Sequence, residues 1–361
     1  MVNKNCGVDT MKRLETLYSR KGVDQAFAIM WQPNPVIGAY AARYPEGETE
    51  YPDPEGRALF WKRVYEAYPA ELEDDSMPSS YLIEFDQGLM PGLLGADVHM
   101  MRNPNNAWIS SMTFPLGSHI CDLPALVLDR DNIWFRRYVR QMELYRDIGA
   151  GVYGVSHLTS LSGLNAMMEF LGASNAYYAL ADEPESSLKF IYESVEFGRL
   201  LQDEFFSRVA LTNGGTFGYS AQWSPGRIIA ESVDAFHMTS VGMFRQFGRD
   251  PLAKMISYYD GAMMHIHSNG LHLLEDVCAI SGVICIQLGD DVNAGFRIYE
   301  RMDELDARRG DVPLIISIPL DVFARRLERR ELHGNVLYMV SDAPDVAESN
   351  RIMEKVRAYR R

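Results

Sequence analysis

The sequence is poor in cysteine and in basic residues, and it lacks long apolar runs and nucleotide-binding motifs. It holds four cysteines, Cys6, Cys121, Cys278 and Cys285, and no two of them form a C-x-x-C pair. This argues against a disulfide-stapled secreted domain and against a zinc ribbon. Free, scattered thiols are typical of an intracellular protein.

Basic residues are also in the minority. Lys and Arg total 35 against 49 Asp and Glu, so the formal net charge is −14. A negative surface repels nucleic acid and anionic membranes, so we expect neither as a partner. No stretch approaches the roughly 18 consecutive apolar residues of a membrane span. Residues 1–22 lack the apolar run of a signal peptide, and we therefore expect a cytoplasmic protein.

Nucleotide-binding motifs are missing as well. No G-x-G-x-x-G follows the first expected strand, and no P-loop is present. The glycine-rich stretch at 211–218, LTNGGTFG, matches neither spacing. We interpret it as a turn that enters a strand, which argues against a dinucleotide fold and a P-loop fold.

The regular feature of the sequence is an alternation of short apolar runs with amphipathic stretches. Helices are expected between nearly all of the apolar runs, most clearly at 181–206 and 343–361. Strands are expected at 107–114, 151–156, 215–220, 233–238, 261–266, 282–288, 313–318 and 335–340. This pattern predicts an α/β fold, a (β/α)8 TIM barrel over residues 101–361.

Residues 1–100 follow a different pattern. They are rich in proline around 32–56 and show no long periodicity, apart from a short helix expected at 57–68 and a strand at 79–85. We interpret them as a loop-rich N-terminal extension packed on the barrel. The sequence leaves open whether this extension is a lid or the contact of a homodimer.

Candidate site residues gather at the ends of the expected strands, where a barrel carries its active site. His265 and His267 end one strand, and Cys285 and Gln287 lie on the next. Because the side-chain period of a strand is two, the two imidazoles should point the same way. They could bind zinc, hydrogen-bond a substrate or serve the structure, while Cys285 fits a core position.

Further candidates follow from the same argument. His237 and His157 lie near expected strand ends, and both are candidate catalytic residues. Asp86 is a third, with a loop or cap role as the alternative. Trp223 and Tyr219 could form an aromatic wall that binds substrate, although a core role for Tyr219 is the other interpretation.

Several segments together resemble the uroporphyrinogen decarboxylase-like superfamily. Its barrels include the corrinoid-linked, zinc-dependent methyltransferases and cobalamin-independent methionine synthase. The resemblance covers about residues 80–361 and rests on loose motifs whose order and spacing agree. These motifs are the loop and helix pair at 158–195, ESVDAFHMTSVGMFRQFGRDPLAKM at 231–255, MMHIHSNG at 263–270, and the last strand and helix at 335–357.

The resemblance implies a zinc site with altered ligands. In the methyltransferases an H-x-C pair and a later cysteine hold the metal. His265 matches the histidine, His267 stands in place of the first cysteine, and Gln287 lies near a glutamate ligand of methionine synthase. Ser341 and Asp342 stand where the late cysteine would be, so Asp342 is the expected third ligand. Two imidazoles and a carboxylate form a harder ligand set, in the hard–soft sense, than His-Cys-Cys. Such a set suits zinc with an oxygen substrate, or a site without metal.

The resemblance also implies a function. We expect a methyltransferase that moves a methyl group between a small substrate and a corrinoid or thiol acceptor at zinc. The chain carries no corrinoid-binding module of its own, so the corrinoid would arrive on a separate protein.

Two alternatives remain open at this point. One is a metal-free, decarboxylase-like lyase acting on a small carboxylic acid. Uroporphyrinogen itself is disfavoured, because the expected arginine clamp is reduced to Arg43. The other is a non-catalytic barrel that binds a tetrapyrrole or corrinoid.

Overall fold

The computed structural model describes residues 2–156, 159–160, 162–218 and 222–361. Among them, no helix combines the length and the apolar character needed to cross a membrane. The predicted site residues His157 and Tyr219 lie outside the described residues.

The core of the fold is a parallel sheet of seven strands. In spatial order these are β1 (Ala26–Met30), β14 (Val336–Ser341), β13 (Leu314–Pro319), β12 (Val283–Gly289), β11 (Gly261–His267), β10 (Ile228–Ser232) and β7 (Thr159–Ser160). Every pair of neighbours in this sheet is parallel. Both faces of such a sheet are covered, which explains why β12, β13 and β14 are nearly continuous apolar runs.

Two smaller sheets complete the β structure. A four-stranded sheet holds β3 (Ser79–Tyr81), β6 (Gly154–Ser156), β8 (Gly215–Gly218) and β9 (Gln222–Pro225). A three-stranded antiparallel sheet holds β2 (Gly47–Thr49), β4 (Val98–Asn103) and β5 (Trp108–Thr113). The structure is thus a mixed α/β fold with a parallel central sheet.

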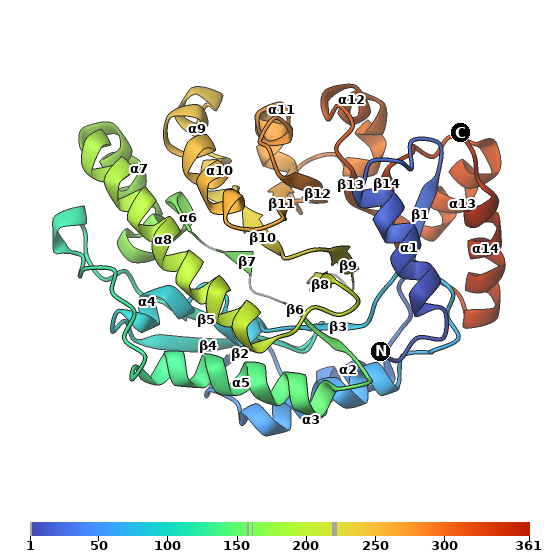
Figure 1. The fold of residues 1–361 in the computed structure, drawn as a ribbon, viewed down its shortest axis with the longest axis horizontal. Coiled ribbons are helices and arrows are strands. Elements are labelled where there is room, and N and C mark those ends of the chain that lie inside the picture. The colour runs from blue at the N-terminus through green and yellow to red at the C-terminus, as the bar shows by residue number, and fades with distance from the viewer. Residues whose placement is uncertain (1, 157–158, 161, 219–221) are drawn as a thin grey trace.

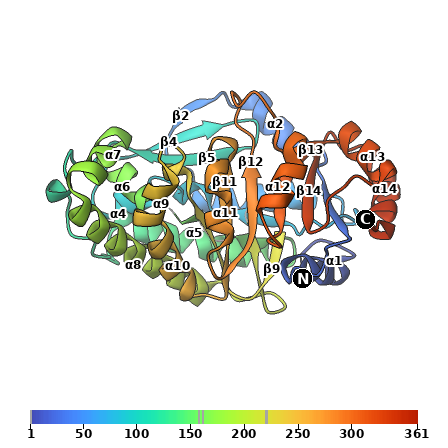
Figure 2. The ribbon, with the colours of Figure 1, turned by 90° about the horizontal axis from the view of Figure 1, so that it is seen from above.

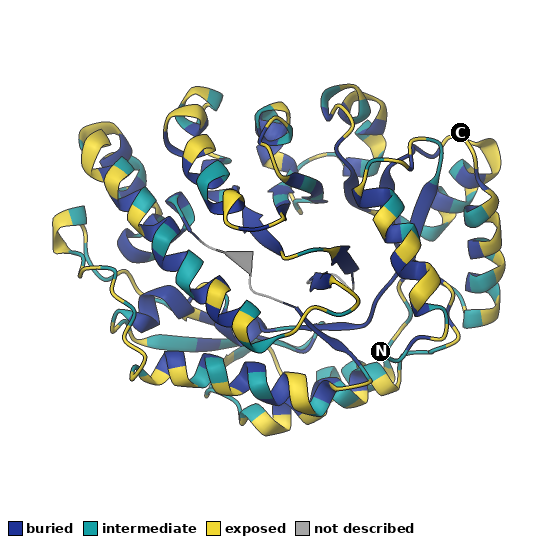
Figure 3. Ribbon diagram, in the orientation of Figure 1, coloured by how far each residue is buried: buried dark blue, intermediate teal, exposed yellow. Residues whose placement is uncertain are grey.

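Helices surround the strands (Figures 1 and 2). The α-helices are α1 (Gly7–Tyr18), α2 (Pro35–Arg43), α3 (Pro54–Glu66), α4 (Leu89–Leu93), α5 (Ile133–Gly149), α6 (Leu164–Leu171), α7 (Ala173–Asp182), α8 (Pro184–Arg208), α9 (Val241–Phe247), α10 (Arg249–Ser257), α11 (Leu274–Cys278), α12 (Met302–Arg308), α13 (Leu320–Arg329) and α14 (Val346–Ala358). The 3₁₀ helices are η1 (Ile83–Phe85), η2 (Ile120–Asp122), η3 (Asp234–Phe236), η4 (Ser268–Leu273) and η5 (Ile298–Arg301). Figure 3 shows buried strands inside and helices exposed along their outer faces.

The predicted strands at 261–266, 282–288, 313–318 and 335–340 are confirmed as β11 to β14. The strand at 107–114 is also real, but as β5 it belongs to the antiparallel sheet. The strand predicted at 233–238 is wrong. The chain leaves β10 at Ser232, whose hydroxyl accepts a hydrogen bond from the Asp234 N–H at 3.1 Å, and turns into η3. The helix predicted at 181–206 begins as α8 at Pro184, because Asp182 ends α7.

The first hundred residues supply more than a loop-rich extension. All five residues of β1 are buried, and this strand pairs with β14 in the central sheet. β3 pairs with β6 in the four-stranded sheet. The boundary between extension and barrel stays a prediction, but part of the segment before it lies within the sheets.

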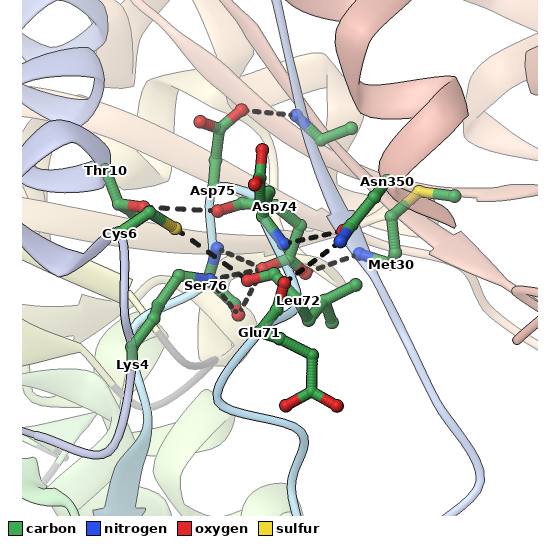
Figure 4. Close-up of polar contacts among 12 residues, drawn as sticks. Lys4, Cys6, Thr10, Met30, Glu71, Leu72, Asp74, Asp75, Ser76 and Asn350 are labelled. Atoms are coloured by element: carbon green, nitrogen blue, oxygen red, sulfur yellow. Dashed lines mark hydrogen bonds and ion pairs between the residues drawn. The ribbon is translucent and has the colours of Figure 1, made fainter. Parts of the chain in front are cut away.

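Two aspartates hydrogen-bond to β1 beside the sheet (Figure 4). Asp75 accepts from the Ala28 N–H at 2.9 Å, and Asp74 accepts from the Met30 N–H at 2.8 Å. Lys4 neutralises the buried Asp74, with its Nζ 2.6 Å from Oδ1. The carboxylates therefore satisfy backbone groups that a neighbouring strand would otherwise pair, which fixes the N-terminal segment to the sheet.

Candidate functional site

A cavity of about 570 Å³ lies at the carboxyl ends of β10, β11 and β12. This is the edge where parallel α/β sheets usually bind ligands, and the volume suits a small molecule. Its lining comprises Tyr81, Ile83, Asp86, Gln87, Trp108, Asn165, Met168, Glu169, Ser232, Asp234, Ala235, His265 and Gln287.

Two histidines end β11 on the same side of the strand. The rings of His265 and His267 lie with centroids 4.6 Å apart and nearly perpendicular planes. Gln287 on β12 is the register partner of His265, and its Oε1 contacts His265 Nδ1. The structure thus brings together the two imidazoles and the amide that the strand period predicts.

Asp234 joins these histidines from the turn after β10. Its Oδ2 lies 3.7 Å from Nε2 of His265 and 3.8 Å from Nε2 of His267. One ligand atom from each of the three residues falls within 4.8 Å of the others. Donors bound to one zinc ion at about 2.1 Å lie roughly 3.4 Å apart, so small side-chain movements would complete a three-ligand site.

An oxygen atom lies beside Nδ1 of each imidazole. Nδ1 of His265 contacts Gln287, and Nδ1 of His267 lies 3.1 Å from Oδ1 of Asp291. Asp291 in turn accepts a hydrogen bond from the Ser268 hydroxyl at 2.7 Å. Such contacts favour a proton on Nδ1 and leave the Nε2 lone pairs facing the cluster. Burial lowers the pKa of His265, which keeps its ring in the neutral, ligating form.

His237 lies behind Asp234 and is absent from the cavity wall. Its Nε2 is 3.1 Å from Oδ1 of Asp234, and its side chain is 5% exposed. Burial lowers its pKa to about 4, so the ring is neutral at pH 7. A Cβ on Gly270 would lie 2.2 Å from its Cδ2, so only glycine leaves room for the ring. The position suits a residue that orients Asp234, whereas the predicted catalytic role remains a prediction.

A second part of the cavity lining, called the carboxyl wall below, carries the two carboxyl groups of Asp86 and Glu169. Asp86, directly after η1, accepts hydrogen bonds from the N–H and hydroxyl of Ser111 at 2.8 and 2.9 Å. Burial nevertheless raises its pKa to about 6. Glu169 on α6 has a pKa of about 7, raised first by burial and then by the charge of Asp86. The pair therefore retains protons close to neutral pH.

Asp342, the predicted third ligand, does not join the cluster. It is exposed just after β14, and β12 and β13 lie between β14 and β11. Its Oδ2 accepts a hydrogen bond from the neighbouring Ser341 hydroxyl at 2.9 Å. Asp234, and not Asp342, is the carboxylate that lies beside the two histidines.

Trp223 also lies away from the cavity. It is 1% exposed in a core cluster with Phe217, Met263 and Cys285. Its indole N–H donates to the Thr212 carbonyl at 2.8 Å. Cys285 thus occupies the core position that the sequence favoured, and Trp108 and Tyr81 provide the aromatic lining instead.

The sequence reasoning missed Asp234 and Glu169. Asp234 lay inside the segment 231–255 that carried the family resemblance, but the expected strand there drew attention to His237. Glu169 is an acid within the strongly amphipathic helix α6, whose other lining residues are apolar or amide. The sequence signal that could have indicated Glu169 is a single acid among the apolar residues of one helix.

Comparison with known proteins identifies a structure of similar fold but no sequence family. No protein-family model matches the chain, and no curated protein matches it. The chain is similar in structure to a methyltransferase from Methanosarcina mazei, with a TM-score of 0.62 and 11% identity. The alignment covers 97% of this chain and 98% of that one, so the two proteins share their fold over nearly their whole lengths.

Proposed function

We propose that the protein is a zinc-dependent methyltransferase of the uroporphyrinogen decarboxylase-like superfamily. It would move a methyl group between a small substrate and a corrinoid or thiol acceptor. The observation that carries this proposal is the cluster of Asp234, His265 and His267 at the cavity edge. The likeness in fold to the Methanosarcina mazei methyltransferase supports it.

The strand arrangement supports a (β/α)8 barrel as the architecture. β6 of the four-stranded sheet precedes β7 of the seven-stranded sheet by a short link in the chain, and β8 packs near β10. The two sheets would then continue one another around a closed ring. The cavity would lie at the carboxyl-end mouth of that ring, where barrel enzymes carry their active sites.

The residues present fit a zinc ion. Two imidazole nitrogens and one carboxylate oxygen are a donor set that zinc accepts. The buried Oδ1 of Asp234 has no hydrogen bond among the described residues, although Nε2 of His237 lies 3.1 Å away. When bound, zinc would act as a Lewis acid on a substrate oxygen and would lower the pKa of a thiol.

The other residues of the cavity have roles that follow from their chemistry. Trp108, Tyr81 and Met168 present apolar surface to a methyl group and limit the access of water. Glu169, with Asp86 beside it, would give a proton to the heteroatom that loses its methyl group. Gln287 would keep His265 in the tautomer that leaves Nε2 free.

The methyl acceptor is expected to come from outside the chain. We propose a corrinoid held by a separate protein, with a small thiol as the alternative acceptor. Adding a reduced cobamide with candidate methyl donors, or a methyl-cobamide with a thiol acceptor, to the zinc-loaded protein should produce a change in the corrinoid absorption spectrum.

Metal content tests the proposal most directly. Protein purified without chelators should contain about one zinc per chain, lost in the His265→Ala/His267→Ala variant. His272→Ala is the matched control, because His272 lies on η4 with its Nε2 2.9 Å from the Thr239 carbonyl oxygen. Background zinc in properly folded wild-type protein would refute the proposal.

The acid pair favours a second candidate function. Glu169, whose pKa of about 7 leaves it partly protonated at neutral pH, could deliver a proton to the carbanion left by loss of carbon dioxide, and the charge of Asp86 helps to hold that proton. The protein would then be a metal-free, decarboxylase-like lyase for a small carboxylic acid. Release of carbon dioxide from a substrate by chelator-treated protein would support this candidate over the first.

A further inference from the structure

A second hollow, of about 660 Å³, lies between α2, α3 and the antiparallel sheet of β2, β4 and β5. It shares no lining residue with the cavity at the histidine cluster. Ile109 lines this hollow and its neighbour Trp108 lines the other cavity. Because consecutive strand residues point to opposite faces, β5 separates the two sites.

Arginines without acidic partners gather in this hollow. Arg43, Arg63 and Arg102 line it, and none of them forms an ion pair with a described residue. This is notable in a chain where acidic residues outnumber basic ones, 49 to 35. A fourth arginine, Arg57, is neutralised by the buried Glu84 at 2.6 Å.

Two acids also line the hollow, Asp53 and Glu50, and against the three arginines that form no ion pair with a described residue they leave an excess of one positive charge. Asp53 caps α3, where its Oδ2 accepts from the Gly56 N–H at 2.7 Å. Glu50 is exposed to solvent and forms no ion pair with a described residue. The arginines therefore provide a local excess of positive charge.

Two of the guanidinium groups share one aromatic ring. Cζ of Arg43 lies 5.1 Å and Cζ of Arg102 lies 4.9 Å from the centroid of Tyr44. The two guanidinium carbons therefore lie at most about 10 Å apart, and an anion bound near both would lessen the repulsion between their charges. Arg102 is partly positioned, since it donates to the Thr49 hydroxyl at 2.6 Å. Its buried Nε has no hydrogen bond among the described residues and is free to donate.

Aromatic side chains extend the site beyond the arginines. The ring of Tyr40 lies 4.8 Å from that of Tyr44 and 5.1 Å from that of Phe60, centroid to centroid. Tyr51 completes the aromatic part of the lining. Such a surface takes a planar ring by stacking or by edge contact. The guanidinium fork, in turn, matches the oxygens of a carboxylate or a phosphate.

We propose that this hollow binds an aromatic anion, a planar ring that carries a carboxylate or a phosphate group. Arg43 and Arg102 hold the anionic group, and Tyr40 and Tyr44 hold the ring. The site stands on its own contacts and does not depend on zinc or on methyl transfer.

Calorimetric titration with benzoate and with phenyl phosphate tests the proposal and tells a carboxylate from a phosphate ligand. At least one of them should bind at millimolar or lower concentration, and more tightly than inorganic phosphate or benzyl alcohol. Arg43→Ala/Arg102→Ala should weaken binding at least about tenfold. Arg325→Ala/Arg351→Ala removes the same charge from exposed ion pairs on α13 and α14 and should leave binding unchanged.

The controls separate this site from the histidine cluster and from misfolding. His265→Ala/His267→Ala should bind the aryl anion as the wild type does. If Arg43→Ala/Arg102→Ala fails to fold, the single Arg43→Ala change at an exposed position and the charge-preserving Arg43→Lys/Arg102→Lys variant replace it, and both should weaken binding. Absence of binding by both aryl anions, or unchanged binding in the folded arginine variants, would overturn the proposal.

Discussion

The two walls of the cavity carry opposite kinds of titratable group on different kinds of structure. One wall presents His265 at the end of a regular parallel strand, and the other presents Asp86 and Glu169 from a 3₁₀ turn and a helix. Burial lowers the pKa of the imidazole and raises the pKa of both carboxyl groups. One physical effect thus leaves free lone pairs on the first wall and protons on the second.

This contrast separates metal binding from proton transfer in space. If it is correct, changes on the histidine wall should alter metal affinity, and changes on the carboxyl wall should alter responses to pH. The following experiments would sharpen or break that separation, beginning with the largest expected effect.

Asp234→Ala should weaken zinc binding by more than about a hundredfold, because it removes a proposed ligand. Loss of a residue that only supports a ligand already costs about 10–100-fold in affinity. Asp342→Ala is the matched control, since its exposed carboxylate lies outside the cluster and its loss should leave the affinity unchanged. Competition with a chromophoric chelator measures both. Equal zinc affinities in the two variants would show that Asp234 is not the third ligand.

Glu169 should make folding stability depend on pH. Its pKa is raised from 4.5 to about 7, so the native state binds the proton more tightly than the unfolded chain. The resulting stability is fully present below pH 4.5 and is lost as the pH rises through 7, a change on the order of 3 kcal/mol. Glu169→Gln should flatten this part of the curve.

Urea unfolding of wild type and Glu169→Gln between pH 4.5 and 8 measures the difference. Parallel stability curves for the two proteins would show that Glu169 ionises normally. Glu169 would then be ionised at neutral pH and could not donate a proton there.

Gln287→Leu should weaken zinc binding by about 10–100-fold without removing a ligand, since it releases Nδ1 of His265 from its oxygen acceptor. The same chelator competition applies. Gln287→Glu restores an acceptor at this position and should recover most of the affinity. An unchanged affinity in Gln287→Leu would mean that the amide serves the substrate instead.

The smallest effect concerns coupling within the carboxyl wall. Asp86→Asn should lower the pKa of Glu169, because the charge of Asp86 raises it. Burial, the larger cause, persists in the variant, so the pKa should stay above 4.5. NMR titration of carboxyl-labelled glutamate reports the shift, with the exposed Asp250→Asn on α10 as the control. A rise in the pKa would contradict the coupling.

The histidine wall was accessible from the sequence because it lies on strands. β11 and β12 are apolar runs, and the two-residue period places His265 beside His267 without further information. Strands β1 and β10 were not predicted, because β1 is short and directly precedes a proline-rich region, while β10 contains the buried acid Glu231.

Of the carboxyl wall, the sequence named Asp86 as a candidate but not Glu169. Asp86 and Glu169 lie on elements far apart in the chain, and only tertiary packing makes them face one cavity. Asp234 was missed because a ligand on a turn follows no period. Trp223 misled because an aromatic residue near a strand end is equally suited to a core, where the structure places it.

The pairing of β1 with β14 has a consequence for synthesis of the protein. β1 emerges from the ribosome early, yet its strand partner spans residues 336–341 near the other end of the sequence. Until that partner arrives, the nascent chain carries an apolar strand with one bare edge, a template for association with other chains. Translation that stalls before residue 336 should therefore yield aggregates, and chaperones that shield nascent chains should matter most for this first strand.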